Sequence, residues 1–255
     1  MITRTEIPDE LTESLVRRDH TAEHINRIAN HPNVRPFIGM AEMGELDFEQ
    51  ISHRAVFLVT EHGGFIFDRI DPGYYCLHTM FLPEGRGKHV ARAAQAAAFW
   101  MFCRTDATEI VTFSPKDRPL TRPPRSMGWR NWFEGKHYDA YRLSLMDWAS
   151  NAPELTEWGE WFHTVLEQAK KEQNSEIPAH EDDPANDRFA GMAAAMAYHG
   201  QPFKAVYHYN RWAQIAGYDL VLLESEDPVR INAMDAIWTV KSTEVEIETC
   251  QQRLQ

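Results

Sequence analysis

One segment constrains the fold of this chain more than any other: HTMFLPEGRGKHVARAAQAAAFWMFCRT, which begins at His78. Its apolar start is typical of a β-strand, and a loop with proline and glycine follows over residues 82–87. The alanine-rich part that follows predicts a helix of about 16 residues, because alanine has the highest helix propensity. The segment TEIVTFSP, from residue 108, then indicates a buried strand. A strand, loop, helix and strand in this order predict a helix packed on a sheet.

Three β segments with short connections precede the helix, at 54–60, 64–70 and 74–82. Turns are expected at Gly63-Gly64 and at Asp71-Pro72-Gly73, so the three strands read as antiparallel neighbours. Before them, apolar spacing predicts a helix over 11–30 that stops at Asn30, and HPNVRPFIG predicts an extended segment over 31–39. After them, a segment rich in proline and arginine spans 116–131, and the alternating pattern YDAYRLSLMDW predicts a strand over 138–148.

The remaining residues predict a smaller module of a different kind. Amphipathic periodicity indicates a helix over 153–173, with Leu155, Trp158, Phe162, Val165 and Leu166 on one face. An acidic, proline-containing linker follows at 174–187, then helices at 188–199 and 203–216 and two or three strands over 218–250. The expected class is therefore α+β (α/β): a mixed central sheet with flanking helices, and a small C-terminal α+β extension. The expected domains are 1–150, a helix and linker at 151–187, and a module at 188–255.

Composition excludes several classes of protein. The 255 residues are 43% hydrophobic and 25% charged, which excludes collagen, coiled coil and wholesale disorder. No apolar run reaches the roughly 18 residues of a membrane helix, and the first ten residues lack the apolar core of a secretory signal. Three distant cysteines without a CxxC predict reduced thiols and a cytoplasmic location.

Charge is distributed unevenly along the chain. Residues 1–150 hold 18 Lys/Arg against 20 Asp/Glu, whereas residues 151–255 hold 8 against 18. From Arg86 to Arg142 the balance reverses to 11 basic against 5 acidic residues. One face of the first domain therefore suits an anion, whereas the acidic remainder disfavours nucleic acid and anionic lipid as partners.

The loop before the alanine-rich helix is the candidate anion site. A helix N-terminus presents backbone N–H groups and the positive end of the helix dipole. Gly85 and Gly87 allow close approach of the backbone, and Arg86 and Lys88 add positive charge. The loop has neither the GKS/GKT of a Walker loop nor an early GxGxxG. Spacing alone leaves an ordinary strand–helix turn open as the alternative.

With these residues the chain resembles the GCN5-related N-acetyltransferase superfamily, whose R/Q-x-x-G-x-G/A loop binds the pyrophosphate of acetyl-coenzyme A. Phrases such as GGFIF and LHTMFLP resemble acetyltransferase-like proteins of tailed bacteriophages in particular. The resemblance covers about residues 1–148. It implies three antiparallel strands, the motif helix, and a following strand that splays from its neighbour to admit the pantetheine arm. The implied cofactor-binding residues are Arg86, Gly87, Lys88, His89, Val90 and Ala91 in the loop, and Ile110, Val111 and Phe113 on the strand.

The chain also departs from the family pattern. His89 replaces the middle glycine of the motif, and prolines interrupt the family's next helix after Asp117. For catalysis, the resemblance implies His78 as the base, and Tyr138 and Tyr141 are candidate acids. The alternatives are a hydrogen-bonded histidine of the sheet and two packing tyrosines.

The resulting hypothesis is an acetyl-coenzyme A-dependent N-acyltransferase of unknown acceptor, encoded by a phage. The alternative is a non-catalytic virion-associated or accessory protein that uses the same fold as a scaffold. We expect an amine-bearing acceptor, no metal, and neither membrane nor nucleic acid as a partner. A virion or host-protein partner, a virion location and a homo-oligomer stay open.

Overall fold

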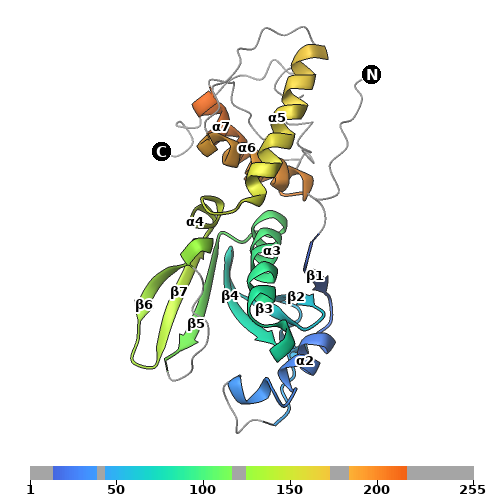
Figure 1. Cartoon of the computed structure of the whole chain (residues 1–255), viewed down its shortest axis with the longest axis vertical. Helices are drawn as coiled ribbons and strands as arrows, with labels where there is room; N and C mark the ends of the chain where they lie inside the picture. Colours follow the sequence, from blue (N-terminus) through green and yellow to red (C-terminus); the bar gives the residue numbers. More distant parts are fainter. Residues whose placement is uncertain (1–13, 39–43, 117–124, 173–183, 217–255) are drawn as a thin grey trace. The chain divides into compact units, whose positions relative to one another are not determined.

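The computed structural model describes residues 14–38, 44–116, 125–172 and 184–216 (Figure 1). The chain divides into two compact units. Ser14–Asn151 form the first, which we call the sheet unit, whereas Ala152–Gln255 and Met1–Glu13 are assigned to the second, the helical unit. The three domains expected from the sequence stay a prediction, and the strands expected over 218–250 lie outside the described residues.

The sheet unit is built on seven strands in the order β1-β2-β3-β4-β5-β7-β6. In chain order they are β1 (Arg17–Asp19), β2 (Ala55–Thr60), β3 (Gly63–Asp71), β4 (Tyr74–Phe81), β5 (Glu109–Pro115), β6 (Arg130–Glu134) and β7 (Tyr138–Ser144). Every neighbouring pair is antiparallel except β4 and β5, which are parallel. A parallel pair requires a crossover connection, and α3 (Lys88–Arg104) supplies it. The predicted α+β class with a mixed central sheet is confirmed.

Side chains of alternating strand residues are buried on both faces of β2–β4. One set packs with the short helix α2 (Glu23–Ala29): Phe57, Val59, Ile66 and Met80 share a core with Ile25 and Ile28 of α2. The other set, which includes Leu58, Phe65, Phe67 and Phe81, is also buried, on the face along which α3 runs in Figure 1. The alanine-rich sequence of α3 buries Ala93, Ala97 and Ala98, whose small side chains allow a helix to lie close to a sheet. We call these surfaces the α2 face and the α3 face.

The predicted helix over 11–30 is wrong in its described first half. Residues 17–19 form β1, which pairs with Phe57–Val59 at the edge of the sheet, and the helix begins only at Glu23. Leu15, one of the apolar residues whose helical spacing predicts that helix, is exposed, whereas Val16 is buried. Pairing with a sheet edge outweighs a weak helical periodicity because the edge offers a row of backbone partners. Asn30 ends the helix as predicted.

Four further local predictions need correction. Residues 31–38 form turns and the 3-10 helix η1 (Arg35–Phe37) rather than an extended segment. Gly63 and Gly64 lie within β3, not in the turn, because the tight approach of β4 leaves no room for a Cβ: one on Gly63 would lie 2.4 Å from the carbonyl oxygen of Met80. Strand β6 lies at the end of the stretch predicted to be irregular, and the predicted last strand ends at Ser144, where α4 (Leu145–Ala149) begins.

The helical unit contains three described helices: α5 (Glu154–Glu172), α6 (Pro184–Tyr198) and α7 (Pro202–Ala216). The predicted helices are confirmed, but α6 begins inside the stretch predicted as linker. Trp158, Phe162 and Trp212 are fully buried, and the Phe162 and Trp212 rings meet edge to face at 5.2 Å. Large aromatic side chains thus form the core of this unit.

Gly191 lies at a close approach of α5 and α6. A Cβ there would lie 2.0 Å from the carbonyl oxygen of Leu155. In an exposed helix, replacing glycine by alanine raises the free energy of unfolding by about 1 kcal/mol. Here the clash reverses the sign of this change. We therefore expect Gly191→Ala to lower the free energy of unfolding by about 1–3 kcal/mol. Denaturant unfolding measures it, with Gly44→Ala as the control because a Cβ at Gly44 meets nothing within 4 Å. Increased stability of Gly191→Ala would contradict this packing.

Candidate functional site

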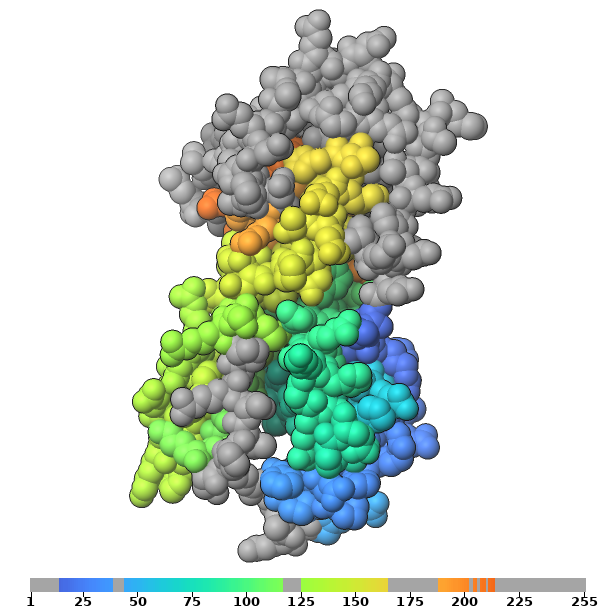
Figure 2. Space-filling view, viewed as in Figure 1, coloured from blue at the N-terminus to red at the C-terminus, as the bar shows by residue number. Residues whose placement is uncertain are grey.

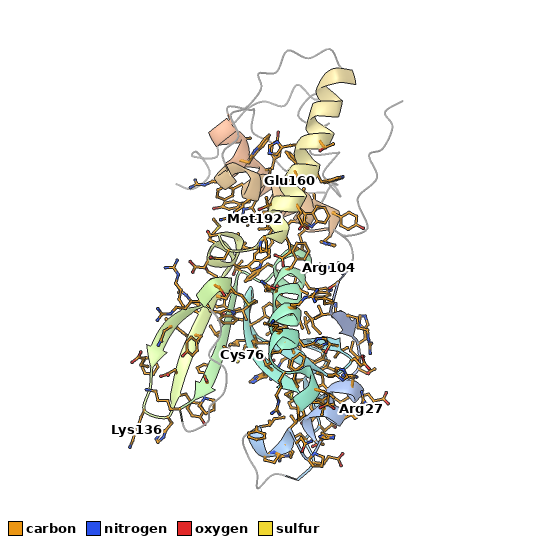
Figure 3. All side chains as sticks on the ribbon, viewed as in Figure 1. Arg27, Cys76, Arg104, Lys136, Glu160 and Met192 are labelled. Carbon is orange, nitrogen blue, oxygen red and sulfur yellow. The ribbon has the colours of Figure 1, made fainter. Side chains whose placement is uncertain are left out.

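The central feature of the sheet unit is the point where β4 and β5 part. The two strands pair over only three positions, Tyr74 with Glu109, Tyr75 with Ile110 and Cys76 with Val111. Beyond them, Thr112 Oγ1 donates a hydrogen bond of 2.9 Å to the Leu77 carbonyl oxygen. From there the strands diverge in Figure 1, and Figure 3 labels Cys76 where they separate. The facing edges of the later β4 and β5 residues are therefore not paired with each other.

The loop between β4 and α3 ends in an uncapped helix N-terminus. Gly87 occupies the N-cap position with φ +70°, and no side chain caps the helix. The first backbone hydrogen bond of the helix is donated by the Ala91 N–H to the Gly87 carbonyl oxygen. The amides of Lys88, His89 and Val90 lie in the turn whose N–H groups have no carbonyl to bond within the helix. A Cβ on Gly87 would meet nothing within 4 Å, so the space beside these amides is open.

Arg86 fixes the loop through its side chain. Its Nε donates to the Phe81 carbonyl oxygen at 3.2 Å, and a terminal nitrogen donates to the Asn33 carbonyl oxygen at 3.1 Å. The guanidinium also lies 5.7 Å from the centre of the Phe37 ring. Figure 2 shows the start of α3 beside the blue segment that contains η1. The structure therefore gives Arg86 a positioning role, which its place in the motif did not reveal.

His89 lies on one side of the loop. Its imidazole is 6.0 Å from that of His62, centre to centre. His62 precedes β3 in the turn from β2, and Gly63 pairs with Phe81 at the end of β4. The His89 side chain thus lies on the β3 side of the loop, whereas the divergence of the strands opens on the β5 side.

His78 lies on β4 two residues beyond the last position paired with β5. It pairs with Ile66, so its side chain is on the α2 face, next to that of Cys76 on the same strand. His78 is exposed, but the protein surrounding the imidazole lowers its pKa from the ordinary value through desolvation, which the charge of Asp68 partly offsets. Burial, and to a lesser extent Asp68, raises the pKa of the Cys76 thiol to about 11. At neutral pH the site thus presents a neutral imidazole and a neutral thiol.

The two candidate tyrosines are separated by the sheet. Tyr141 pairs with Thr112, at the point of divergence, and is buried on the α3 face. Tyr138 pairs with Pro115 at the end of β5 and is exposed on the α2 face, the face of His78. Only one of the two hydroxyls can therefore serve a given side of the sheet.

The predicted strand residues differ in their surroundings. Ile110 and Val111 are buried and still lie opposite β4, whereas Phe113 lies beyond the divergence and is exposed. Thr112 and Leu77, which the sequence did not single out, define the start of the opening. In the sequence these two residues are recognisable only as members of two apolar strands. Which strands pair, and over how many residues, depends on the whole sheet.

Of the basic residues after β5, two described members are paired. Lys116 Nζ lies 3.1 Å from Asp139 Oδ1, and Arg130 forms an ion pair with Asp147. Within the described part of the chain no three His, Cys, Asp or Glu side chains form a metal-binding group, and no helix there has the length and apolar character to span a membrane. Cys76 is a free thiol, Cys103 is buried in α3, and Cys250 lies outside the described residues.

Comparison with known proteins yields structures alone: no family model and no curated protein matches the sequence. An acetyltransferase from Streptococcus agalactiae is 19% identical, with 51% of this chain and 97% of that chain covered, at a TM-score of 0.36. Apo FdhC, a nucleotide-linked sugar GNAT, is 10% identical; the match covers 53% of this chain and 89% of that chain, at a TM-score of 0.39. A spermidine N-acetyltransferase SpeG chimera from Vibrio cholerae and hSSAT is 13% identical; the match covers 53% of this chain and 97% of that chain, at a TM-score of 0.37. At these identities and TM-scores the likenesses carry nothing on activity or substrate, and none supports a phage origin.

Proposed function

We propose that the sheet unit is a coenzyme A-dependent N-acyltransferase that transfers an acetyl group to an amine. One observation carries the proposal: two parallel strands separate beside an open, uncapped helix N-terminus within a single β4–α3–β5 crossover. From α2 to β5 the element order is also the one that the resemblance to GCN5-related acetyltransferases implies, with the three antiparallel strands β2–β4 before α3; β1 is an additional strand before α2.

The residues at the loop suit the pyrophosphate of coenzyme A. The amides of Lys88, His89 and Val90, with the helix dipole behind them, would bind its oxygens. Gly87 leaves the space beside these amides open, and Lys88 adds a positive charge at the first turn. Arg86 contributes by holding the loop to η1.

The divergence of the strands suits an extended, amide-bearing chain such as pantetheine. Unpaired edges of β4 and β5 offer backbone donors and acceptors in the way a sheet edge offers them to an added strand. On β5, the run from Ile110 and Val111 to Phe113 leads from the paired part into the opening. Bound acetyl-coenzyme A would supply an activated thioester.

His78 is the proposed base. An amine attacks only when neutral, so the ammonium form of the acceptor must first lose a proton. The lowered pKa of His78 keeps its imidazole neutral, and able to accept that proton, at neutral pH. Tyr141, in register with Thr112, and Tyr138, on the face of His78, are the two candidates for returning a proton to the departing thiolate.

Gly87→Ala tests the cofactor site. With φ +70° and ψ −129°, this position strains any L side chain, and the added Cβ would enter the space beside the amides. We expect calorimetry to show saturable acetyl-coenzyme A binding by the wild type and at least about tenfold weaker binding by the variant. Gly200→Ala is the matched control: Gly200 also has positive φ (+76°) and open space at its Cβ, but it lies in the helical unit.

Either of two results would reject the proposal. One is the absence of coenzyme A binding by a folded wild type, which would favour the non-catalytic scaffold. The other is equal loss of binding in Gly87→Ala and Gly200→Ala, which would trace the loss to general destabilisation rather than to the loop.

A further inference from the structure

Exposed aromatic side chains lie on the face of the sheet that carries the proposed base. Phe113 of β5 and Phe133 of β6 are 53% and 63% exposed, and both pair with Ala140 of β7, so they share the α2 face. Tyr138, 54% exposed, precedes Ala140 by two residues on the same strand and is therefore on the same face. We call Phe113, Tyr138 and Phe133 the aromatic row. Exposed aromatic side chains that gather on one face mark interaction sites more often than inert surface.

His78 lies at the β4 end of the aromatic row. Cys76 of β4 pairs with Val111 of β5, and paired residues of neighbouring strands have their side chains on the same face. His78 and Phe113 each follow these residues by two positions, so they too are on the α2 face. Because the strands separate after Cys76 and Val111, His78 and Phe113 flank the opening from its two sides.

The surroundings of His78 leave an acceptor one direction along this face. On the β3 side, His78 pairs with Ile66, which is buried in the core that α2 covers. Met80, two residues further along β4, is buried in the same core. On the β5 side lie the opening and the exposed ring of Phe113. An acceptor whose amine is at the His78 imidazole therefore extends across the opening and over the aromatic row.

The charged side chains of this face favour an acceptor whose body is uncharged. Asp68, which pairs with Cys76, binds Arg54 through two hydrogen bonds, one to each carboxylate oxygen. Glu109 of β5 lies 3.6 Å from Arg142 of β7, and both are on the α2 face. Each of these two carboxylates is already neutralised by an arginine. They therefore offer little attraction to a second ammonium group, such as that of a polyamine.

We propose that the acceptor is an arylalkylamine, a monoamine whose aromatic ring stacks on the aromatic row while its nitrogen lies at His78. This inference rests on the proposed acyltransferase function and names its substrate class. Neighbouring strands lie about 4.8 Å apart, and the opening widens this spacing between β4 and β5. A ring over Phe113 is thus about one to two strand spacings from His78, which a linker of about two or three carbons spans.

The reaction balances with this acceptor and acetyl-coenzyme A alone. The ammonium form of the amine gives one proton to His78, and the neutral nitrogen then forms a bond to the acetyl carbon. The bond between that carbon and the sulfur of coenzyme A breaks. The second proton of the nitrogen passes to the departing thiolate, so the products are an N-acetylated arylalkylamine and coenzyme A thiol.

Two amines with the same linker separate stacking from simple hydrophobicity. 2-Phenylethylamine and 2-cyclohexylethylamine differ only in whether the ring is aromatic, and the cyclohexyl ring is the more hydrophobic. Release of coenzyme A thiol by the full chain should give a kcat/KM for the phenyl compound about three- to tenfold above that for the cyclohexyl compound. It should also lie at least about tenfold above kcat/KM for ethylamine, which has no body to bury.

Substitution of Phe113 tests whether the aromatic row causes this preference. Phe113→Leu should bring the ratio of the phenyl to the cyclohexyl kcat/KM to about one, whereas Phe113→Tyr, which keeps a ring, should retain it. Tyr74→Leu is the matched control, because Tyr74 is 45% exposed on the same face but lies in the paired part of β4, on the other side of Cys76 from His78. A ratio compares two substrates on one protein, so a general loss of activity or of cofactor affinity cancels.

The outcomes separate this inference from the acyltransferase proposal. Transfer to all three amines with a phenyl-to-cyclohexyl ratio of one or less would overturn the inference and leave the acyltransferase standing. A preference that Phe113→Leu keeps, or that Tyr74→Leu also loses, would overturn it too, because the aromatic row would not be its cause. A protein that binds coenzyme A but acetylates none of the three amines would show that the acceptor belongs to another class. A folded protein that binds no coenzyme A would instead reject the acyltransferase proposal itself.

Discussion

Replacing His78 by glutamine is expected to lower kcat for acetyl transfer about 100-fold, with the affinity for coenzyme A unchanged within about twofold. Glutamine keeps a similar size and hydrogen-bonding capacity but cannot accept a proton at neutral pH. The His78 side chain lies on the α2 face of β4, whereas the proposed contacts of β4 with coenzyme A are made by backbone groups, so its replacement removes the base and keeps those contacts. Release of coenzyme A thiol with a panel of primary amines measures the rate, and His20→Gln, at an exposed histidine, is the control.

The pH dependence separates a base from a packing residue. Because the pKa of His78 is lowered from 6.5, the imidazole is already deprotonated at neutral pH. The acidic limb of kcat/KM in the wild type should therefore lie below pH 6.5, and His78→Gln should lose that limb along with the rate. A variant that retains wild-type kcat, or that loses activity with its acidic limb unchanged, would exclude His78 as the base.

The second large effect concerns acid stability of the helical unit. His208 on α7 is 1% exposed and lies beside the rings of Phe189 and Tyr207, and within the described residues its Nδ1 has no hydrogen-bond partner. Desolvation, and to a lesser extent Lys204, lowers the pKa of His208 to about 3. An unfolded chain protonates its histidines near pH 6.5, so between these values the unfolded state binds more protons.

The stability that the neutral His208 confers is therefore complete above about pH 6.5 and is lost as the pH falls toward 3, by up to about 1.4 kcal/mol per pH unit. We expect the tryptophan fluorescence of the α5–α7 core to report unfolding at mildly acidic pH. His208→Leu, which cannot be protonated, should flatten this dependence, with His20→Gln again as the control. If both proteins show the same slope, His208 is not the origin of the acid sensitivity.

The sequence predicts well where local and global preferences agree. From residue 55 to residue 115, three β-rich runs, a D-P-G turn and an alanine-rich stretch each admit one interpretation, and the strands and α3 lie within a residue or two of their predicted ends. The motif also identified the loop at Gly87 correctly as the start of a helix. Turn chemistry and helix propensity act within a few residues, so they can be read without knowing the partners.

Predictions failed where a distant partner decides the structure. β1 is a strand only because Phe57–Val59 offer an edge to Arg17–Asp19. β6 has no alternating pattern because all its residues are exposed. The contacts of Arg86 and the position of His89 beside His62 depend on loops far apart in the sequence. The separation of β4 from β5 after three pairs likewise follows from the packing of the whole sheet.

We propose that the α3 N-terminus and the β4–β5 opening bind coenzyme A together. The most direct measurement is a coenzyme A titration of the isotope-labelled protein, followed by the backbone amide resonances of each residue. We predict saturable shifts of Lys88, His89 and Val90, together with shifts of Leu77 and Thr112 at the start of the opening. Saturable binding that shifts amides elsewhere and leaves both of these groups unchanged would contradict the claim.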